Sequence, residues 1–410
     1  MTTTAPPVLP PPAPPAPPAN RRVVAVGLLL AAALLVAVGI AGGPLLAGAT
    51  ALGLALGVVL FHSRFGFTSA WRQLAAVGQG AALRAHMLML AVAAVLFAVI
   101  LPNGLAIGGD PSPQLGPIGL ALFVGAFLFG IGMQIGGSCA SGTLFSVGSG
   151  QLAIVYTLAG FVVGSVLAVL SWDFWTTTVP RGPVVDLAAV LGYPGALAAS
   201  LAAMAVVVGI TVVVGRRRNP PPLDAPPSAA GWRRAVRGSW PLWAGAIALA
   251  VLNAATLVVT GSPWGITSAF ALWGSKLAAV FGADPASWTY WSTPGNAAAL
   301  ARPVLADRTS VMDLGIMVGA LVASALGGVF TLHRRIPART VVAALLGGVL
   351  MGYGARIAGG CNIGAYFSGI ASFSLHGWLW GLTALLGTVA GLALRPLFGL
   401  ANPKPSDAVC

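Results

Sequence analysis

The residues best suited to chemistry in this chain are two cysteines that hold the same position in two copies of one motif. Cys139 lies within residues 130–146 and Cys361 within residues 352–368, and the two are 361 − 139 = 222 residues apart. The chain has only 3 cysteines in 410 residues, so a duplicated cysteine marks the organisation of the whole sequence. A thiol is a weak hydrogen-bond donor, and its sulfur is a soft, polarisable acceptor. The pair is therefore suited to a sulfur-containing anion that passes from one thiol to the other.

Glycine and small polar residues surround both cysteines. Glycine lets a backbone approach a ligand closely, and the start of a short helix presents unpaired N–H groups to an anion. A second repeated stretch, at residues 66–70 and 265–269, adds hydroxyl groups. The predicted substrate-binding residues are Cys139, Cys361, Gly137, Ser138, Gly360, Asn362, Arg356, Gln134, Thr68 and Thr267.

Arg356 is the charged member of the cysteine motif, and it aligns with Gln134 in the other copy. One interpretation is an attractor for anions near the outer mouth of a pathway, because a charge within a membrane span is a functional candidate by default. The other is an arginine near a helix end whose side chain extends to the membrane interface. The sequence leaves both interpretations open.

The sequence does not favour metal binding or enzymatic catalysis. Soft-metal sites need several Cys, Met or His ligands close together, and no histidine lies in either cysteine motif. We therefore expect no metal and no cofactor. Paired acids, a base beside a nucleophile and a nucleotide-binding loop are all missing, so we do not expect an enzyme. Asp313, near a helix start on the outer side, is the aspartate closest to a span interior, which argues against coupling by a buried acid.

The composition is that of an integral membrane protein. Hydrophobic residues make up 57% of the chain and charged residues 7%, and the mean hydropathy is +0.91. A soluble domain has about a quarter charged residues. The apolar runs are long and continuous, which indicates helical spans and not barrel strands. The cations behind the net charge of +13 cluster between spans, so we expect contact with the lipid bilayer and no nucleic-acid binding.

The predicted fold is an all-α membrane protein of about ten transmembrane helices and four short re-entrant helices. The short apolar stretches begin near Phe65, Ser138, Trp264 and Gly360, and they are shorter than the roughly 20 residues that a bilayer requires. Short, glycine-broken segments at matching places in two halves are typical of a transporter's binding site. The spans are predicted near residues 23–41, 44–61, 84–101, 118–136, 151–171, 195–215, 241–260, 311–331, 340–357 and 376–394.

The arginines orient these spans. With the N-terminus in the cytoplasm, the arginine-rich connections fall on the cytoplasmic side, as the positive-inside rule expects, and the C-terminus is cytoplasmic too. Gly66 and Cys139 then approach the membrane centre from the cytoplasm, whereas Gly265 and Cys361 approach it from outside. The two halves are therefore predicted to be inverted repeats that meet near the midplane.

The same patterns divide the chain into five segments. We expect a disordered proline-rich tail at residues 1–22 and a first transmembrane repeat at residues 23–215. A cytoplasmic linker at residues 216–239 leads to the second, inverted repeat at residues 240–400, and residues 401–410 form a flexible C-terminal tail.

The cysteine motifs resemble those of the YeeE/YedE membrane proteins of bacterial sulfur and selenium metabolism. The resemblance covers residues 23–400 and is most specific around the two cysteines and at residues 374–380. It implies a thiosulfate-uptake protein of the bacterial inner membrane, in which Cys139 and Cys361 interact in turn with thiosulfate. It also implies a small cytoplasmic sulfur-carrier protein as a partner.

One position departs from the family. A third functional cysteine often lies near the first short segment, where this chain has Gly66. Either the relay is shorter here or the substrate differs. The alternative function is a membrane component of sulfur or selenium metabolism in which Cys139 or Cys361 carries sulfur covalently as a persulfide.

Overall fold

The computed structural model describes residues 17–220, 229–332 and 335–404, and these residues form helices and no strand. Nine helices in the described part of the chain are long and apolar enough to cross a membrane. The predicted all-α membrane fold is therefore confirmed, whereas the number of ten spans stays a prediction. Most of the predicted N-terminal tail, much of the proline stretch of the linker, and Cys410 lie outside the described residues.

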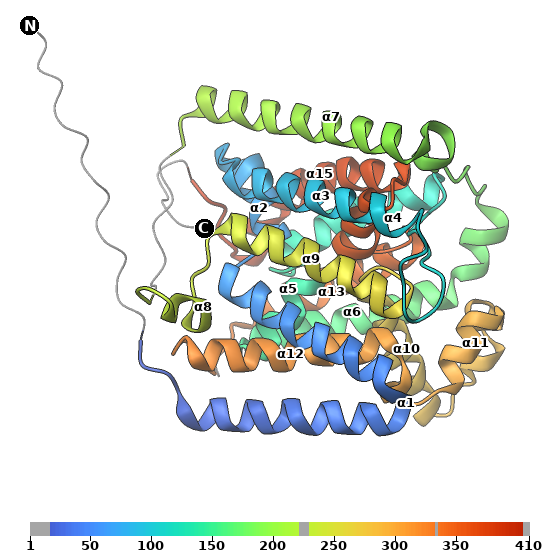
Figure 1. Ribbon diagram of the computed structural model, residues 1–410, viewed down its shortest axis with the longest axis horizontal. Helices are drawn as coiled ribbons and strands as arrows, with labels where there is room; N and C mark the ends of the chain where they lie inside the picture. Colours follow the sequence, from blue (N-terminus) through green and yellow to red (C-terminus); the bar gives the residue numbers. More distant parts are fainter. Residues whose placement is uncertain (1–16, 221–228, 333–334, 405–410) are drawn as a thin grey trace, which may run out of the picture.

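The first helix, α1 (Arg21–Ser63), consists of two antiparallel arms that meet at a break (Figure 1). As one straight helix its 43 residues would extend about 64 Å, roughly twice the hydrocarbon core of a bilayer. Gly43 has a non-helical φ of 81° and is followed by Pro44, which lacks the N–H that a helix interior needs. The break lies between the two spans predicted at residues 23–41 and 44–61.

Four short helical segments lie at the predicted short apolar stretches, and long helices separate them. The short ones are α2 (Phe67–Val77), α5 (Ala140–Gly148), α10 (Thr267–Val280), and η5 (Asn362–Ser368) continued by α14 (Gly369–Ala371). The long ones are α3 (Ala81–Ile100), α4 (Leu120–Ile135), α6 (Leu152–Leu170), α7 (Leu187–Arg218), α9 (Leu242–Thr260), α12 (Arg308–Leu326), α13 (Ala338–Ile357) and α15 (Leu375–Leu394). The connections carry η1 (Phe174–Thr178), α8 (Arg233–Arg237), η2 (Pro285–Ser287), η3 (Thr289–Ser292), α11 (Pro294–Ala301), η4 (Val304–Ala306) and η6 (Arg395–Phe398).

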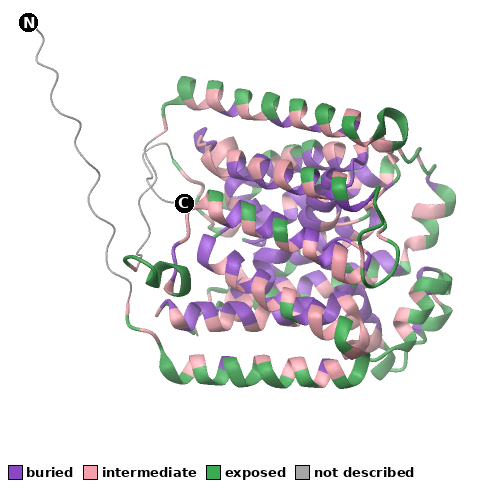
Figure 2. Ribbon diagram, viewed as in Figure 1, coloured by how far each residue is buried: buried purple, intermediate pink, exposed green. Residues whose placement is uncertain are grey.

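The core consists of helix pairs that take one member from each half of the chain. α1 packs on α12 and α6 on α13, while α9 packs on α3 and α15 on α4. The first arm of α1 and the whole of α7 lie at opposite edges and are largely exposed (Figure 2). α7 packs on α3, as the first arm of α1 packs on α12. We therefore propose that α7 opens the second repeat, which would place the boundary near residue 187 instead of residue 215.

Pairs of glycines four residues apart let these helices approach closely. Gly53 and Gly57 of α1 face the backbone of α12, and Gly315 and Gly319 of α12 face the backbone of α1. The α6–α13 pair repeats the arrangement with two glycines on each helix. Small residues at this spacing are typical of membrane helices, whose association depends on close backbone packing.

Replacing Gly57 by alanine is expected to destabilise the protein. An added Cβ would overlap the carbonyl oxygen of Ile316, a backbone atom, so α1 and α12 would have to separate. Overpacking of this kind costs about 1–3 kcal/mol, which should lower the thermal unfolding midpoint in detergent. The control is Gly209→Ala in α7, where an added Cβ meets no described atom within 4 Å. Equal midpoints for the two variants would contradict this account of the packing.

Candidate functional site

The two cysteines stand at the starts of α5 and η5, and these two short helices contact each other. Both are free thiols, each is 1% exposed, and both belong to one continuous core cluster. They lie close enough for their side chains to interact electrostatically. The fold thus brings together two thiols that are 222 residues apart in the sequence.

The backbone leads into each cysteine with the same geometry. Gly137 has a φ of 81° and Gly359 a φ of 74°, left-handed conformations that favour glycine. Cys139 and Cys361 then have extended backbones, with φ of −88° and −103°. The duplicated sequence therefore builds a duplicated turn, in which each thiol is placed at the first turn of a short helix.

Polar groups without partners lie beside Cys361. The backbone N–H groups of Ile363 and Gly364 donate hydrogen bonds to its sulfur. Asn362 is 1% exposed, and neither polar atom of its side-chain amide has a hydrogen-bond partner in the described part of the chain. A buried amide without a partner loses its hydrogen bonds to water and gains none in return. A ligand beside Cys361 would supply the missing partner.

Serine side chains lie close to Cys139 in the sequence and supply hydroxyl groups to its surroundings. Its Sγ lies 3.6 Å from the Oγ of Ser141. Ser138 is 7% exposed and stands immediately before the thiol. At the equivalent place before Cys361 stands Gly360, whose φ of 146° again favours glycine. The two halves of the site therefore share a backbone but differ in side-chain chemistry.

Gln134 and Arg356 make equivalent contacts in the two halves. The Nε2 of Gln134 donates to the carbonyl oxygen of Thr68 at 3.4 Å, and the Nη2 of Arg356 donates to the carbonyl oxygen of Thr267 at 2.7 Å. Thr68 and Thr267 lie in the first turns of α2 and α10. Each helix that precedes a cysteine is therefore tied to the start of another short helix, and all four predicted residues share this framework. The Oγ1 of Thr68 is buried and has no described partner.

Arg356 is held within the protein. Its Nη1 donates to the hydroxyl of Tyr290 at 2.8 Å, and its guanidinium carbon lies 5.1 Å from the centre of the Tyr290 ring. With Arg181 and Gly359 it lines a cavity of about 230 Å³, and Gly359 is two residues from Cys361. The interpretation of an arginine that extends to the interface is not supported by these contacts. The role as an anion attractor stays a prediction.

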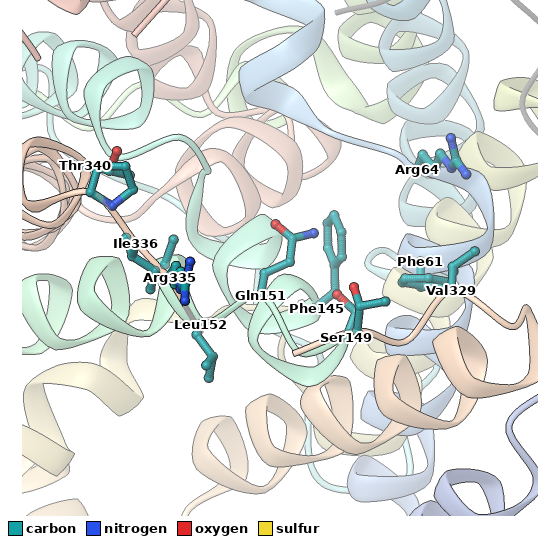
Figure 3. A pocket seen from close by; sticks show the side chains of 13 residues that line it. Phe61, Arg64, Phe145, Ser149, Gln151, Leu152, Val329, Arg335, Ile336 and Thr340 are labelled. Atoms are coloured by element: carbon teal, nitrogen blue, oxygen red, sulfur yellow. The ribbon is translucent and has the colours of Figure 1, made fainter. Parts of the chain in front are cut away.

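A second cavity, of about 530 Å³, lies at the far end of α5 from Cys139 (Figure 3). Phe145 and Ser149 from the α5 end line it, and Arg64 and Arg335 bring positive charge to it. The 9 residues of α5 span about 14 Å between the thiol and this cavity. The two cavities lie at opposite ends of α6, so the thiols stand between two arginine-lined openings.

Asp313 is a buried acid that the sequence pattern did not predict. Its place near the start of a helix indicated no buried acid, whereas the side chain is 0% exposed. Asp313 is the sixth residue of α12, and α1, α5 and α10 pack on that helix and cover it. It also lies close enough to Cys361 for the two side chains to interact electrostatically. The expectation of no buried acid is therefore wrong.

Gly66→Cys, which would add a thiol at the start of the first short helix, is expected to fold at the wild-type level. Gly66 has an extended backbone, with φ of −120° and ψ of 123°. An added Cβ would meet the Oγ of Ser69 at 2.8 Å, and that hydroxyl can rotate away. The yield of monodisperse protein measures the outcome. Gly319→Cys is the matched control with an expected loss, because its Cβ would overlap the backbone of Leu54; a lower yield for Gly66→Cys than for Gly319→Cys would contradict this prediction.

Comparison with known proteins identifies the family of this chain. The family model for sulphur transport matches residues 62–390. The thiosulfate transporter TsuA of Spirochaeta thermophila is 26% identical over 371 residues, which cover 84% of this chain and 98% of that protein. TsuA of Escherichia coli K12 is 25% identical over 350 residues, with 82% and 90% covered. The probable transporter YedE of Escherichia coli K12 is 31% identical over 154 residues, a match that spans only 37% of that protein's length. The family model covers most of this chain, which therefore belongs to the sulphur transport (YeeE/YedE) family.

Proposed function

We propose that this protein transports thiosulfate, or a closely related sulfur-containing anion, across the bacterial inner membrane. The observation that carries the proposal is the buried pair Cys139 and Cys361, at the contacting starts of two short helices and between two arginine-lined cavities. Two relatives named as thiosulfate transporters align over most of their length and support this substrate. The protein would act as a transporter and not as an enzyme.

In this proposal the anion is held by hydrogen bonds and by the polarisable sulfurs. Cys361 and the amide of Asn362 would bind it first, and Cys139 would receive it next. Glycine at positions 137 and 360 would let the backbone approach the anion closely. Hydrogen bonds to a charged ligand are stronger than those between neutral groups, so a few donors suffice to replace part of the anion's hydration.

The arginines support the direction of transport. Arg64 and Arg335 line one cavity, Arg218 ends α7, and Arg234 lies in α8; α8 and the left end of α7 lie on the same side of the bundle in Figure 1. By the positive-inside rule this side is cytoplasmic, and both termini would lie there. The anion would leave through the cavity shown in Figure 3, where a small cytoplasmic sulfur-carrier protein would accept it.

The first test is growth on thiosulfate. We expect the protein to support growth of a bacterium that lacks sulfate uptake when thiosulfate is the only sulfur source, because it would supply the missing entry route. Growth rate and the amount of protein in the membrane would be measured together, with an empty vector as the control. Absence of growth despite normal membrane levels would rule out thiosulfate as the substrate.

The same cells distinguish the alternative function. The alternative is that Cys139 or Cys361 carries sulfur as a stable persulfide. In protein purified from thiosulfate-grown cells, the peptide that contains the modified cysteine would then be heavier by the mass of one sulfur atom. Transport by hydrogen bonding leaves both peptides unmodified. Peptide mass spectrometry without reducing agent separates the two outcomes.

A further inference from the structure

A buried carboxyl group lies on a helix that packs against the start of the thiol site and has no part in the pathway above. Asp313 is 0% exposed, and neither of its carboxyl oxygens has a hydrogen-bond partner among the described residues. It interacts electrostatically with Cys361. Its helix, α12, packs on α5, which begins just after Cys139. The carboxyl group therefore belongs to the same interior as the two thiols.

No positively charged side chain among the described residues forms an ion pair with Asp313. Of the titratable residues near it, Asp307 and Cys361 interact with it electrostatically, and neither is positively charged. Lys276 of α10 donates instead to the carbonyl oxygen of Leu300. The other charged or titratable groups on the elements packed against α12 are Arg21, Arg22 and His62 of α1, Cys139 before α5, Arg308 of α12 itself, and Arg233, Arg234 and Arg237 of α8.

An ionised carboxylate in such a place is unstable, because burial removes its hydration and nothing replaces it. Asp313 therefore holds a proton at rest. An anion at Cys361 strengthens this preference, since a carboxylate beside it would repel it. Proton binding and anion binding thus favour each other, and the linkage is reciprocal by thermodynamic necessity.

A cavity at the start of the same helix could supply the proton. Asp307 and Arg308 line a cavity of about 570 Å³ together with Thr260 and Gly108. Asp307 precedes Asp313 by six residues, about 9 Å along the helix axis. The cavity therefore lies less than two helical turns from Asp313, and water in it is the nearest described source of a proton.

The other half of the protein has a titratable residue at the equivalent place. His86 is the sixth residue of α3, as Asp313 is of α12. It is 1% exposed, its Nδ1 has no partner in the described chain, and its ring lies 4.5 Å from that of Phe67 between centroids. α3 begins on the arginine-rich side, so His86 stands toward the cytoplasmic end as Asp313 stands toward the other.

We propose that Asp313 binds the proton that accompanies the anion, so that the protein is a proton–anion symporter. This rests on the proposed transport of thiosulfate. The proton arrives from water in the cavity of Asp307, forms an O–H bond on the Asp313 carboxylate, and is released to water on the arginine-rich side after the anion has moved. No other bond forms or breaks. The inward proton offsets part of the negative charge that an inside-negative potential opposes.

The test uses the purified full-length protein in liposomes with labelled thiosulfate. Two processes are measured: exchange of thiosulfate across the membrane without a gradient, and accumulation driven by an acidic exterior. Each proton carried per anion should raise the accumulation ratio about tenfold per pH unit. We expect the Asp313→Asn variant to exchange thiosulfate at the wild-type rate but not to accumulate it in response to the pH gradient. Asp110→Asn, which changes an exposed aspartate in the α3–α4 connection, should keep both.

The outcomes separate the two proposals. Wild-type protein that does not exchange thiosulfate would overturn the proposed function. Exchange without a response to the pH gradient, or an Asp313→Asn variant that responds like the wild type, would overturn the symport proposal alone. If Asp313→Asn does not fold, a pH dye inside wild-type liposomes decides the matter. Thiosulfate added outside should then acidify the interior, and an unchanged interior pH would overturn the proposal.

Discussion

Replacement of Cys361 by alanine is expected to lower thiosulfate uptake about 10- to 100-fold, because a hydrogen bond to a charged ligand contributes about 1.5–3 kcal/mol. The change removes only the sulfur from a site whose backbone is set by Gly359 and η5. The amount of protein in the membrane should therefore stay at the wild-type level. Cys139→Ala should have a similar effect, since both thiols would contact the anion in the proposed pathway. The initial rate of labelled thiosulfate uptake, normalised to protein in the membrane, measures the result.

Two further variants make this prediction specific. Cys410→Ala is the matched control, because it removes the third thiol of the chain and leaves Cys139 and Cys361 unchanged. Serine at position 361 keeps a hydrogen-bond donor but loses the polarisable sulfur, so it should restore uptake in part. Wild-type uptake in Cys361→Ala would show that the buried cysteines are packing residues, and the site would have to be sought elsewhere.

Replacement of Arg356 by leucine is expected to have the second large effect. The change removes the guanidinium hydrogen bonds to the Tyr290 hydroxyl in η3 and to the Thr267 carbonyl at the start of α10. The loss of two charge-assisted hydrogen bonds should lower the stability of the protein by about 3 kcal/mol or more. It also removes positive charge from the cavity next to Gly359. We expect uptake to fall at least as far as in Cys361→Ala, together with a lower unfolding temperature.

Two further substitutions distinguish the structural contacts of Arg356 from the effect of its positive charge. Arg356→Gln imitates the other repeat, where Gln134 makes the equivalent contact. If the charge of Arg356 attracts the anion, this variant should have a higher unfolding temperature than Arg356→Leu but a similarly low rate of uptake. Arg181→Leu is the control for charge alone, because Arg181 is exposed in the same cavity. Its effect on uptake should be small and should disappear at high salt, where exposed charges are screened. Full uptake by Arg356→Leu would contradict both roles.

The fold class and the family followed from local properties of the sequence. A bilayer requires long apolar helices whose backbone groups are all paired, so the length and composition of each run predicted a helix in the membrane. The duplicated motif predicted two equivalent cysteines, and glycines at 137 and 359 do share one backbone conformation. The break at Gly43 was likewise predicted as a gap between two apolar runs.

Apolar runs and repeated residues are properties of neighbouring positions along the chain, so they predict a helical membrane protein with two copies of a cysteine motif. What surrounds that motif depends on residues that are distant in the sequence, and it became visible only in the folded chain. One partner of Arg356 is Tyr290, which lies in a connection between α10 and α12 and carries no pattern that predicts the contact. Asp313 is buried because α1, α5 and α10 cover the start of α12, and burial near a helix end depends on these non-local neighbours. The same packing holds this carboxyl group, which has no partner among the described residues, on a helix that contacts α5 after Cys139.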